Sequence, residues 1–179
     1  MRDKWRRAVG LFVVSLMVIL LREAPQQTVM AAEELTFSLV FEKQEHKPSE
    51  PIEVRFKLQN RGKKTLTVNT RFKLGSPQAA PDQREVFLEA RSPSGAVLPA
   101  KFPDGETGLP KSEYFQLLEP GAEAISERKW DVRDYFDFKE PGAYTLTATY
   151  ENVFGKEIGI DAVKERYTTQ TTLKIVEEK

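Results

Sequence analysis

Apolar and polar residues alternate along most of the chain beyond residue 34. The alternation is clearest over 52–59, where Ile52, Val54, Phe56 and Leu58 are separated by charged or amide side chains. A β-strand with one buried and one wet face gives this period of two. Runs of the same kind predict strands over 35–42, 52–59, 65–72, 85–91, 114–118, 124–132, 144–150 and 167–176.

Helical periodicity is missing from the same part of the chain. No window of about eleven residues sustains apolar positions at the 3.6-residue spacing that an amphipathic helix needs. Short strands separated by Pro- and Gly-rich turns are typical of antiparallel sandwiches and barrels. The sequence therefore predicts an all-β domain of about 7–9 strands, with 75–84 and 99–112 as surface loops.

Residues 1–32 differ in character and predict an N-terminal signal helix. Basic side chains in the first seven residues precede an apolar run over 8–21, which is the arrangement of a secretory signal peptide. The run ends well short of the roughly 20 apolar residues that a membrane-spanning helix needs. We therefore expect a cleaved signal over 1–32, a single domain over 33–179, and export to the periplasm, cell envelope or extracellular space. The alternative is an uncleaved signal anchor, which is the one route by which we expect contact with a membrane.

Composition removes several kinds of chemistry. The chain has 27 Lys and Arg, 27 Asp and Glu, a single histidine, His46, and no cysteine. Without cysteine there is no disulfide framework, thiolate zinc site or cysteine nucleophile, and the even charge balance argues against nucleic-acid binding. His46 stands in a polar turn, where we expect an exposed side chain without a catalytic partner. We therefore expect no enzyme activity and no cofactor.

Two other groups of residues raise specific alternatives. Asp131, Asp134 and Asp137 recur at a spacing of three, which could place carboxylates on one helical face and hold Ca²⁺. The simpler interpretation is that Asp131 and Asp134 begin a short helical or turn segment and cap its free backbone N–H groups, so we assign no metal ligand. Trp130 could serve as an aromatic platform for a sugar, but its place in the strand pattern favours core packing.

Two turns of similar sequence carry a resemblance. Leu118–Gly121 and Lys139–Gly142 both end in Glu-Pro-Gly, where proline presets φ at the second position of a type II turn and glycine supplies positive φ at the third. Tyr144 follows the second turn at the head of an alternating strand, like the tyrosine corner of immunoglobulin-like sandwiches. Over residues 35–176 the chain resembles exported bacterial immunoglobulin-like β-sandwich domains. It is similar both to the β-domain that accompanies deuterolysin-like zinc peptidases and to proteinase-inhibitor-like sandwich domains.

The resemblance implies an immunoglobulin-like antiparallel β-sandwich but no activity. The His-Glu-x-x-His zinc motif of the peptidases is absent from this chain, so peptidase chemistry does not carry over. A fold of this kind hosts many functions, and the function must therefore be argued from a site.

The connection over 151–166 is the best candidate for a binding site. It is far longer than the two to five residues that a hairpin loop needs, and it carries Phe154, Ile158 and Ile160. Exposed apolar residues on a long loop are typical of protein recognition. The alternative is that the two strands extend and these side chains pack on the sandwich. In an immunoglobulin-like topology, Arg61 and Lys63 lie at the same end of the domain.

The function that follows is an exported, non-catalytic module that binds another protein through loops at one end of the sandwich. The predicted contact residues are Phe154, Ile158, Ile160, Arg61 and Lys63. Three alternatives remain open, namely a carboxylate-based hydrolase, a carbohydrate-binding domain and a structural domain of the cell envelope. A desolvated carboxylate pair in a deep pocket would favour the hydrolase, whereas an exposed apolar surface would favour the binding module.

Overall fold

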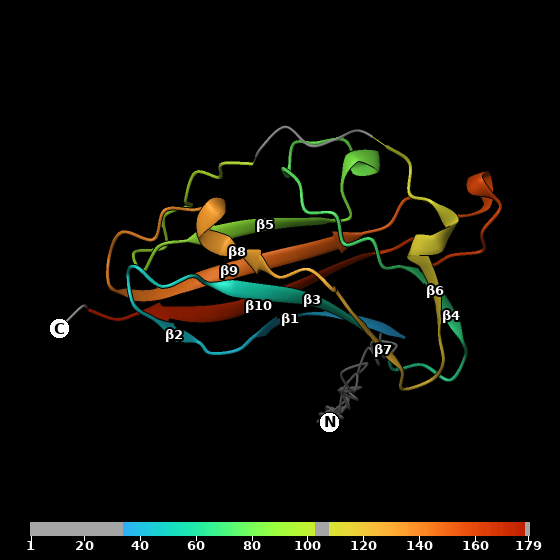
Figure 1. Ribbon diagram of the computed structural model, residues 1–179, viewed down its shortest axis with the longest axis horizontal. Helices are drawn as coiled ribbons and strands as arrows, with labels where there is room; N and C mark the ends of the chain where they lie inside the picture. Colours follow the sequence, from blue (N-terminus) through green and yellow to red (C-terminus); the bar gives the residue numbers. More distant parts are fainter. Residues whose placement is uncertain (1–33, 103–107, 178–179) are drawn as a thin grey trace, which may run out of the picture. The chain divides into compact units, whose positions relative to one another are not determined.

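The computed structural model describes residues 34–102 and 108–177 (Figure 1). The predicted signal segment over 1–32 lies outside the described residues. The described part is built from β-strands and single 3-10 turns, so the all-β prediction is confirmed. None of its helices is long and apolar enough to cross a membrane.

The strands form two four-stranded sheets and one separate pair (Figure 1). The first sheet has β1 (Leu35–Phe41), β3 (Glu53–Asn60) and β7 (Glu123–Ile125) side by side, and β8 (Trp130–Asp131) also pairs with β3. The second has the order β2 (Glu45–His46), β10 (Arg166–Ile175), β9 (Gly142–Glu151) and β5 (Val86–Arg91). The pair consists of β4 (Leu66–Asn69) and β6 (Phe115–Leu118). Four 3-10 turns lie between strands, at Pro81–Gln83, Ser112–Tyr114, Val132–Asp134 and Lys156–Ile158.

The alternation read from the sequence places the core. Val54, Phe56 and Leu58 of β3 are fully buried, as are Leu146 and Ala148 of β9 in the other sheet. These residues belong to a single hydrophobic cluster, within which the rings of Phe37 and Tyr150 lie 5.7 Å apart between centroids. Two sheets that share one core, neither of them closed, fit a β-sandwich.

Three details differ from the predicted strands. The strand expected over 65–72 ends at Asn69, and the short strand β2 was not predicted. The strand expected over 124–132 is divided into β7 and β8. Ser126 causes this break, because its hydroxyl accepts a hydrogen bond from the Phe56 N–H (3.1 Å) and donates one to the Arg128 carbonyl (2.9 Å). The side chain thus takes the place of ladder bonds between backbones.

The predicted type II turn forms at Pro120-Gly121 but not at the second Pro-Gly pair. Gly121 has φ +83°, and the Ala122 N–H donates to the Glu119 carbonyl at 2.9 Å. Gly142 instead has φ +140° and begins β9. A Cβ at this glycine would lie 2.6 Å from Cγ of Pro93, so close packing as well as conformation requires glycine here.

Tyr144 makes the predicted corner contact. Its ring is 2% exposed and packs edge-on against Phe138, with 5.0 Å between centroids. The hydroxyl donates to the Glu140 carbonyl at 2.8 Å and accepts from the Glu140 N–H at 2.9 Å. One phenol therefore bonds both backbone groups of Glu140, two residues before β9 begins.

Replacing Tyr144 with Phe should lower the free energy of unfolding by about 1–2 kcal/mol, because two hydrogen bonds are lost while the ring stays packed. Urea denaturation followed by tryptophan fluorescence measures this change. Tyr114→Phe is the control, because it alters a half-buried tyrosine outside the corner. Tyr167→Phe is less suitable, because the Tyr167 hydroxyl also has a hydrogen-bond partner. An unchanged denaturation midpoint in the Tyr144 variant would contradict the corner's role.

Candidate functional site

The long connection between β9 and β10 packs onto the domain and does not present an apolar tip. Phe154 is only 6% exposed, and Ile158 and Ile160 are half-buried. The prediction that Phe154 is an exposed contact residue is therefore wrong. The alternative reading of this segment, in which its apolar residues pack on the sandwich, describes the structure better.

Asn152 determines the path of this connection. Its side-chain amide donates to the carbonyls of Phe154 (2.9 Å) and Val163 (2.7 Å), and Asn152 itself is 2% exposed. The Val163 N–H then donates to the Thr67 carbonyl on β4 at 2.9 Å. The sixteen-residue segment 151–166 is long because it reaches over to β4 and satisfies that strand's outer edge.

Arg61 and Lys63 are exposed on the turn between β3 and β4. The Arg61 N–H donates to the Glu34 carbonyl at 2.7 Å, and its Nε donates to Oε1 of Gln59 at 3.1 Å. No hydrogen bond or ion pair joins this turn to the connection 152–165 within the described ranges. Whether Ile158, Ile160, Arg61 and Lys63 touch a partner stays a prediction.

His46 is buried, contrary to the expectation of an exposed loop side chain. It is 3% exposed on β2, and its Nε2 lies 3.0 Å from the Lys43 carbonyl. A carbonyl only accepts hydrogen bonds, so Nε2 carries the proton. The burial has a tertiary cause, because residues 45 and 46 pair in parallel with Lys174 and Ile175 of β10.

Asp131 caps the short turn Val132–Asp134 as predicted. Oδ1 of Asp131 accepts hydrogen bonds from the Arg133 N–H (3.0 Å) and the Ile52 N–H (2.9 Å). Asp137 pairs with Lys101 at 2.7 Å, and this hydrogen bond holds the pKa of its carboxyl below the usual range. Among the residues that the structure describes, no group of His, Asp and Glu side chains could hold a metal ion.

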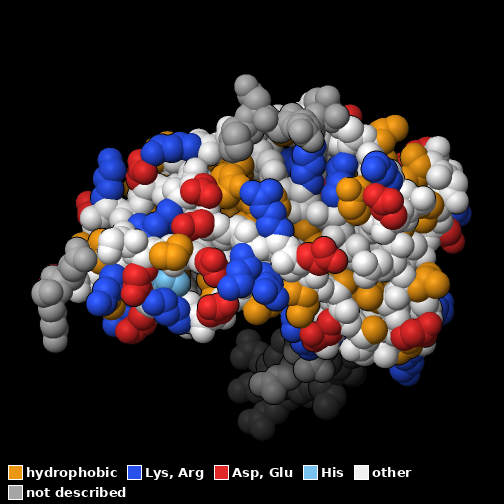
Figure 2. Space-filling view, in the orientation of Figure 1, with side chains coloured by type: hydrophobic (Ala, Val, Ile, Leu, Met, Phe, Trp, Pro, Cys, Tyr) orange, Lys and Arg blue, Asp and Glu red, His pale blue; other side chains and the backbone are white. Residues whose placement is uncertain are grey.

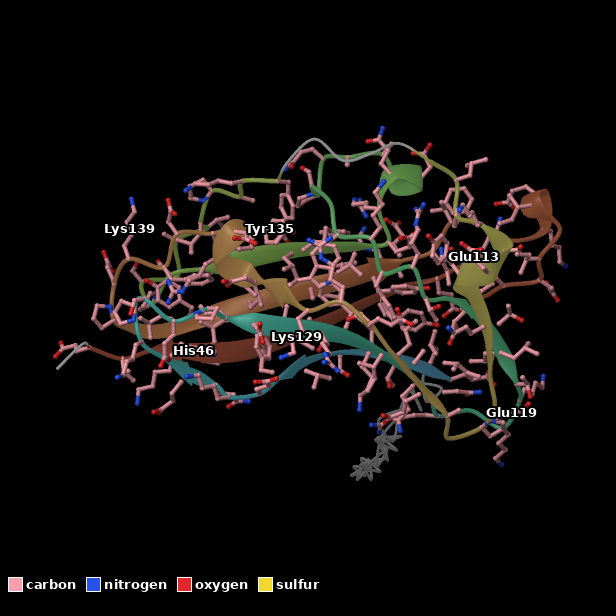
Figure 3. All side chains as sticks on the ribbon, in the orientation of Figure 1. His46, Glu113, Glu119, Lys129, Tyr135 and Lys139 are labelled. Carbon is pink, nitrogen blue, oxygen red and sulfur yellow. The ribbon has the colours of Figure 1, made fainter. Side chains whose placement is uncertain are left out.

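A cleft between β6 and β7, which the sequence did not identify, combines aromatic and exposed apolar residues in its lining. Its volume is about 350 Å³. Tyr114, Gln116 and Glu113 line one side and Ile125, Ser126, Glu127 and Arg128 the other, with Phe72 and Trp130 also in the lining. Figure 1 shows β6 and the β7–β8 segment diverging from their common turn, and Glu113 and Lys129 mark the two sides in Figure 3. We call this site the β6–β7 cleft.

Asn60 holds the narrow end of the β6–β7 cleft. The side chain is fully buried, and Nδ2 donates to the carbonyls of Leu118 and Lys64, each at 2.7 Å. Its backbone N–H donates to the Ala122 carbonyl at 3.0 Å. One asparagine thus ties the start of the turn after β6 and the start of β7 to the end of β3, and the two strands separate beyond it.

Both strands turn an open backbone edge toward the cleft. Thr67 gives its carbonyl to Val163 on the outer side of β4, so Thr67 and its opposite residue Leu117 form a pair whose N–H and C=O groups point away from the β4–β6 ladder. On β7, Ala124 faces Leu58 of β3, which leaves the backbone groups of Glu123 and Ile125 directed away from that sheet. Within the described ranges, no backbone hydrogen bond joins β6 to β7.

Two large apolar side chains are exposed at these edges. Leu117 of β6 is 70% exposed and Ile125 of β7 is 45% exposed. Neither is needed by the core, because their chain neighbours Leu118 and Ala124 fill it. Figure 2 shows apolar side chains interspersed with charged ones over this side of the molecule.

Trp130 packs at the inner end of the cleft and is not a free platform. It is half-buried against the core, 6.2 Å from Phe56 between ring centroids. The guanidinium of Arg128 lies 4.0 Å from the centroid of the indole, which is a cation–π contact that covers that face of the ring. The predicted preference of Trp130 for core packing agrees with this position.

The most deeply buried carboxylate of the described residues lies below the cleft and is fully bonded. Glu85 is 1% exposed and accepts hydrogen bonds from Nε of Arg71 at 2.8 and 2.9 Å, with Nη2 also in contact. The Lys73 N–H and Nδ2 of Asn69 donate to it as well, at 3.0 and 3.2 Å. This is a structural ion pair, and it leaves Glu85 no free oxygen lone pair for acid–base chemistry.

Comparisons with known proteins do not identify this chain. No family model matches it, and no curated protein does. A β-glucosidase of Erythrobacter marinus is similar to 78% of the chain with 17% identity and a TM-score of 0.31, and the match covers 15% of that enzyme. A likeness of this size bears on neither fold nor function.

Replacing Phe154 with Ala should lower the free energy of unfolding by about 3–5 kcal/mol, the usual effect of removing a buried phenylalanine. Ile160→Ala, a change at a half-buried residue of the same connection, is the matched control and should have a smaller effect. Urea denaturation measures both variants. If both variants lose only a small and equal amount of unfolding free energy, Phe154 does not anchor the connection.

Proposed function

We propose that this chain is an exported, immunoglobulin-like binding module without catalytic activity, which takes an extended segment of a partner protein into the β6–β7 cleft. The strand order of the two four-stranded sheets and the corner at Tyr144 support an immunoglobulin-like sandwich. The basic and apolar sequence of the first 21 residues supports export. The cleft supports the binding of a protein segment, as argued next.

The observation that carries the proposal is the pair of open strand edges with exposed apolar residues on both. An extended peptide adds to such an edge through main-chain hydrogen bonds, and alternate side chains give specificity. Ile125 lines the cleft and Leu117 is exposed on β6 outside its lining, and full burial of an exposed side chain of this kind is worth about 1.5–3 kcal/mol. A partner segment that covers them recovers part of this free energy.

A sugar ligand fits the cleft less well. Carbohydrate recognition needs an open aromatic face, but Arg128 lies over the indole of Trp130 at 4.0 Å. Opening that face would first require the loss of the cation–π contact. Of the two other rings in the lining, Tyr114 is half-buried and Phe72 is buried.

A carboxylate-based hydrolase also fits less well. Such an enzyme needs one carboxyl whose pKa is raised by burial. Glu113 and Glu127, the carboxylates that line the cleft, are both exposed. Glu85 is buried but is held by Arg71 and by backbone and amide donors.

The double variant Leu117→Ser with Ile125→Ser tests the proposal. The tagged chain, expressed in its own host, should capture a partner from cell-envelope extract, and the double variant should capture at least about tenfold less because the apolar anchors of an interface dominate its affinity. Stability should stay within about 1 kcal/mol of the wild type, since both residues are exposed.

Val97→Ser is the matched control, because Val97 is 60% exposed but lies beside β5 in the other sheet. This variant should capture the partner as the wild type does. If the control and the double variant lose the same amount of captured partner, the capture is a non-specific apolar effect. Full capture by the folded double variant would place the binding surface elsewhere, and no partner in any extract would favour a structural role in the cell envelope.

A further inference from the structure

A pocket of about 630 Å³ lies beside the edge strand β5, between the segments 75–83 and 97–102. Figure 1 shows these two segments above β5, one before and one after the strand. Most of the lining residues are apolar, and they include Leu98, Phe102 and Phe136. A pocket of this size and lining is typical of a site for a small ligand. We call it the β5 pocket, and it shares no lining residue with the β6–β7 cleft.

The outer backbone edge of β5 is open at Leu88, which lines this pocket. The Gly75 N–H donates to the Val86 carbonyl at 3.0 Å, and the Leu98 N–H donates to the Ala90 carbonyl at 2.8 Å. Alternate residues of a strand direct their backbone groups to the same side, so Leu88, midway between these two bonds, also faces away from β9. No described residue bonds to its N–H or C=O group.

The occupant of this open edge must be short. The edge is closed on both sides of Leu88, by a bridge from Leu74 to Val86 and another from Val97 to Arg91. At about 3.3–3.4 Å per residue, the two bridged positions on β5 are only about 17 Å apart. A full strand of another chain would have to displace one of the bridges, whereas the end of a peptide fits between them. One residue of such a peptide can exchange both backbone hydrogen bonds with Leu88.

The charge of the β5 pocket selects the amino end of a peptide over the carboxyl end. Among the described residues that line the pocket, Glu89 alone has an ionisable side chain. Glu89 is exposed and has no ion pair or hydrogen bond with a described side chain. Arg91 lies two residues along the same face of β5, but it is outside the lining and its Nη1 donates to the Gly95 carbonyl at 3.0 Å. Glu89 therefore attracts a terminal ammonium group and repels a terminal carboxylate.

We propose that the β5 pocket binds the free N-terminus of a short peptide chain whose second residue is apolar. In an antiparallel orientation, the second residue of the peptide pairs with Leu88, and its side chain lies on the same face of the sheet as the Leu88 side chain, toward Phe102 and Phe136. The terminal ammonium group, one residue earlier, then lies beside Glu89. An unblocked amino group and an apolar second residue are therefore the two features that the pocket recognises.

Three dipeptide amides test these features by NMR titration of the isotope-labelled protein, purified from its host. Alanyl-leucinamide should shift the amide resonances of Leu88 and Glu89 in a saturable way. Its N-acetyl derivative, which lacks the charge, should bind about fivefold more weakly at low salt. Glycyl-glycinamide, which lacks the apolar side chain, should bind at least about tenfold more weakly. In the free protein the Leu88 N–H should exchange with solvent faster than the Phe87 N–H, which faces β9, and alanyl-leucinamide should slow this exchange.

Two pairs of variants locate the site. Glu89→Gln should bind alanyl-leucinamide and its N-acetyl derivative equally, because the partner of the ammonium group is gone. Glu127→Gln, at an exposed carboxylate of the β6–β7 cleft, is the matched control and should keep the difference. Ala100→Phe, within the lining, should weaken binding at least about tenfold by filling the pocket. Ala96→Phe, at an exposed alanine outside the lining, should bind as the wild type does. Far-ultraviolet circular dichroism confirms that each variant is folded.

Several results would overturn this site. If alanyl-leucinamide causes no saturable shift at tens of millimolar, the pocket does not bind a peptide end. Equal binding of the free and acetylated forms by the wild type rejects recognition of the amino group. If the difference is lost in Glu127→Gln but kept in Glu89→Gln, the peptide binds in the β6–β7 cleft instead. Exchange of the Leu88 N–H as slow as that of Phe87 in the free protein would show that the edge of β5 is closed.

Discussion

The buried carboxylate of Glu85 is the constraint on which much of this structure depends. A charge removed from water loses several kcal/mol of solvation unless hydrogen bonds replace the lost water. Here Arg71, the Lys73 N–H and the amide of Asn69 supply those bonds. Together these bonds tie the chain from 69 to 73 to Glu85, the residue before β5. The hydroxyl of Tyr150 donates to the Asn69 carbonyl at 2.8 Å, and burial together with the nearby Glu85 charge raises the pKa of this phenol.

That constraint propagates to the cleft and to the long connection. Phe72 is held at φ +47°, a left-handed conformation that is unfavourable for a residue with a Cβ, and its ring lies between Phe56 and Tyr150. The same residue lines the β6–β7 cleft. Asn69 also donates to the side-chain carbonyl of Asn152 at 3.3 Å. The polar cluster therefore sets both the base of the cleft and the path of the connection that covers β4.

The first sheet has two different outer edges, at β7 and at β1. At β7 the edge is short and faces a cleft, so it suits one extended segment of a partner. At β1 the edge is longer, and the strand contains no charged residue, proline or glycine. Between these edges, β3 is paired on both sides and supplies the central core residues.

The sequence by itself determined what depends on neighbours along the chain. The alternation over 52–59 placed β3 and its buried face, Pro120-Gly121 specified a type II turn, and Tyr144 specified its corner, because each is a local matter of side-chain period, φ or a contact four residues away. Tertiary structure decided the rest. His46 is buried because β2 meets β10, and Phe154 is buried because Asn152 and Thr67 draw its segment onto β4. The exposure of Leu117 and Ile125 at open strand edges is likewise a result of tertiary structure. Adjacent apolar residues in a strand show only that one side chain must point outward, whereas the identity of the open edges depends on pairings between strands far apart in sequence.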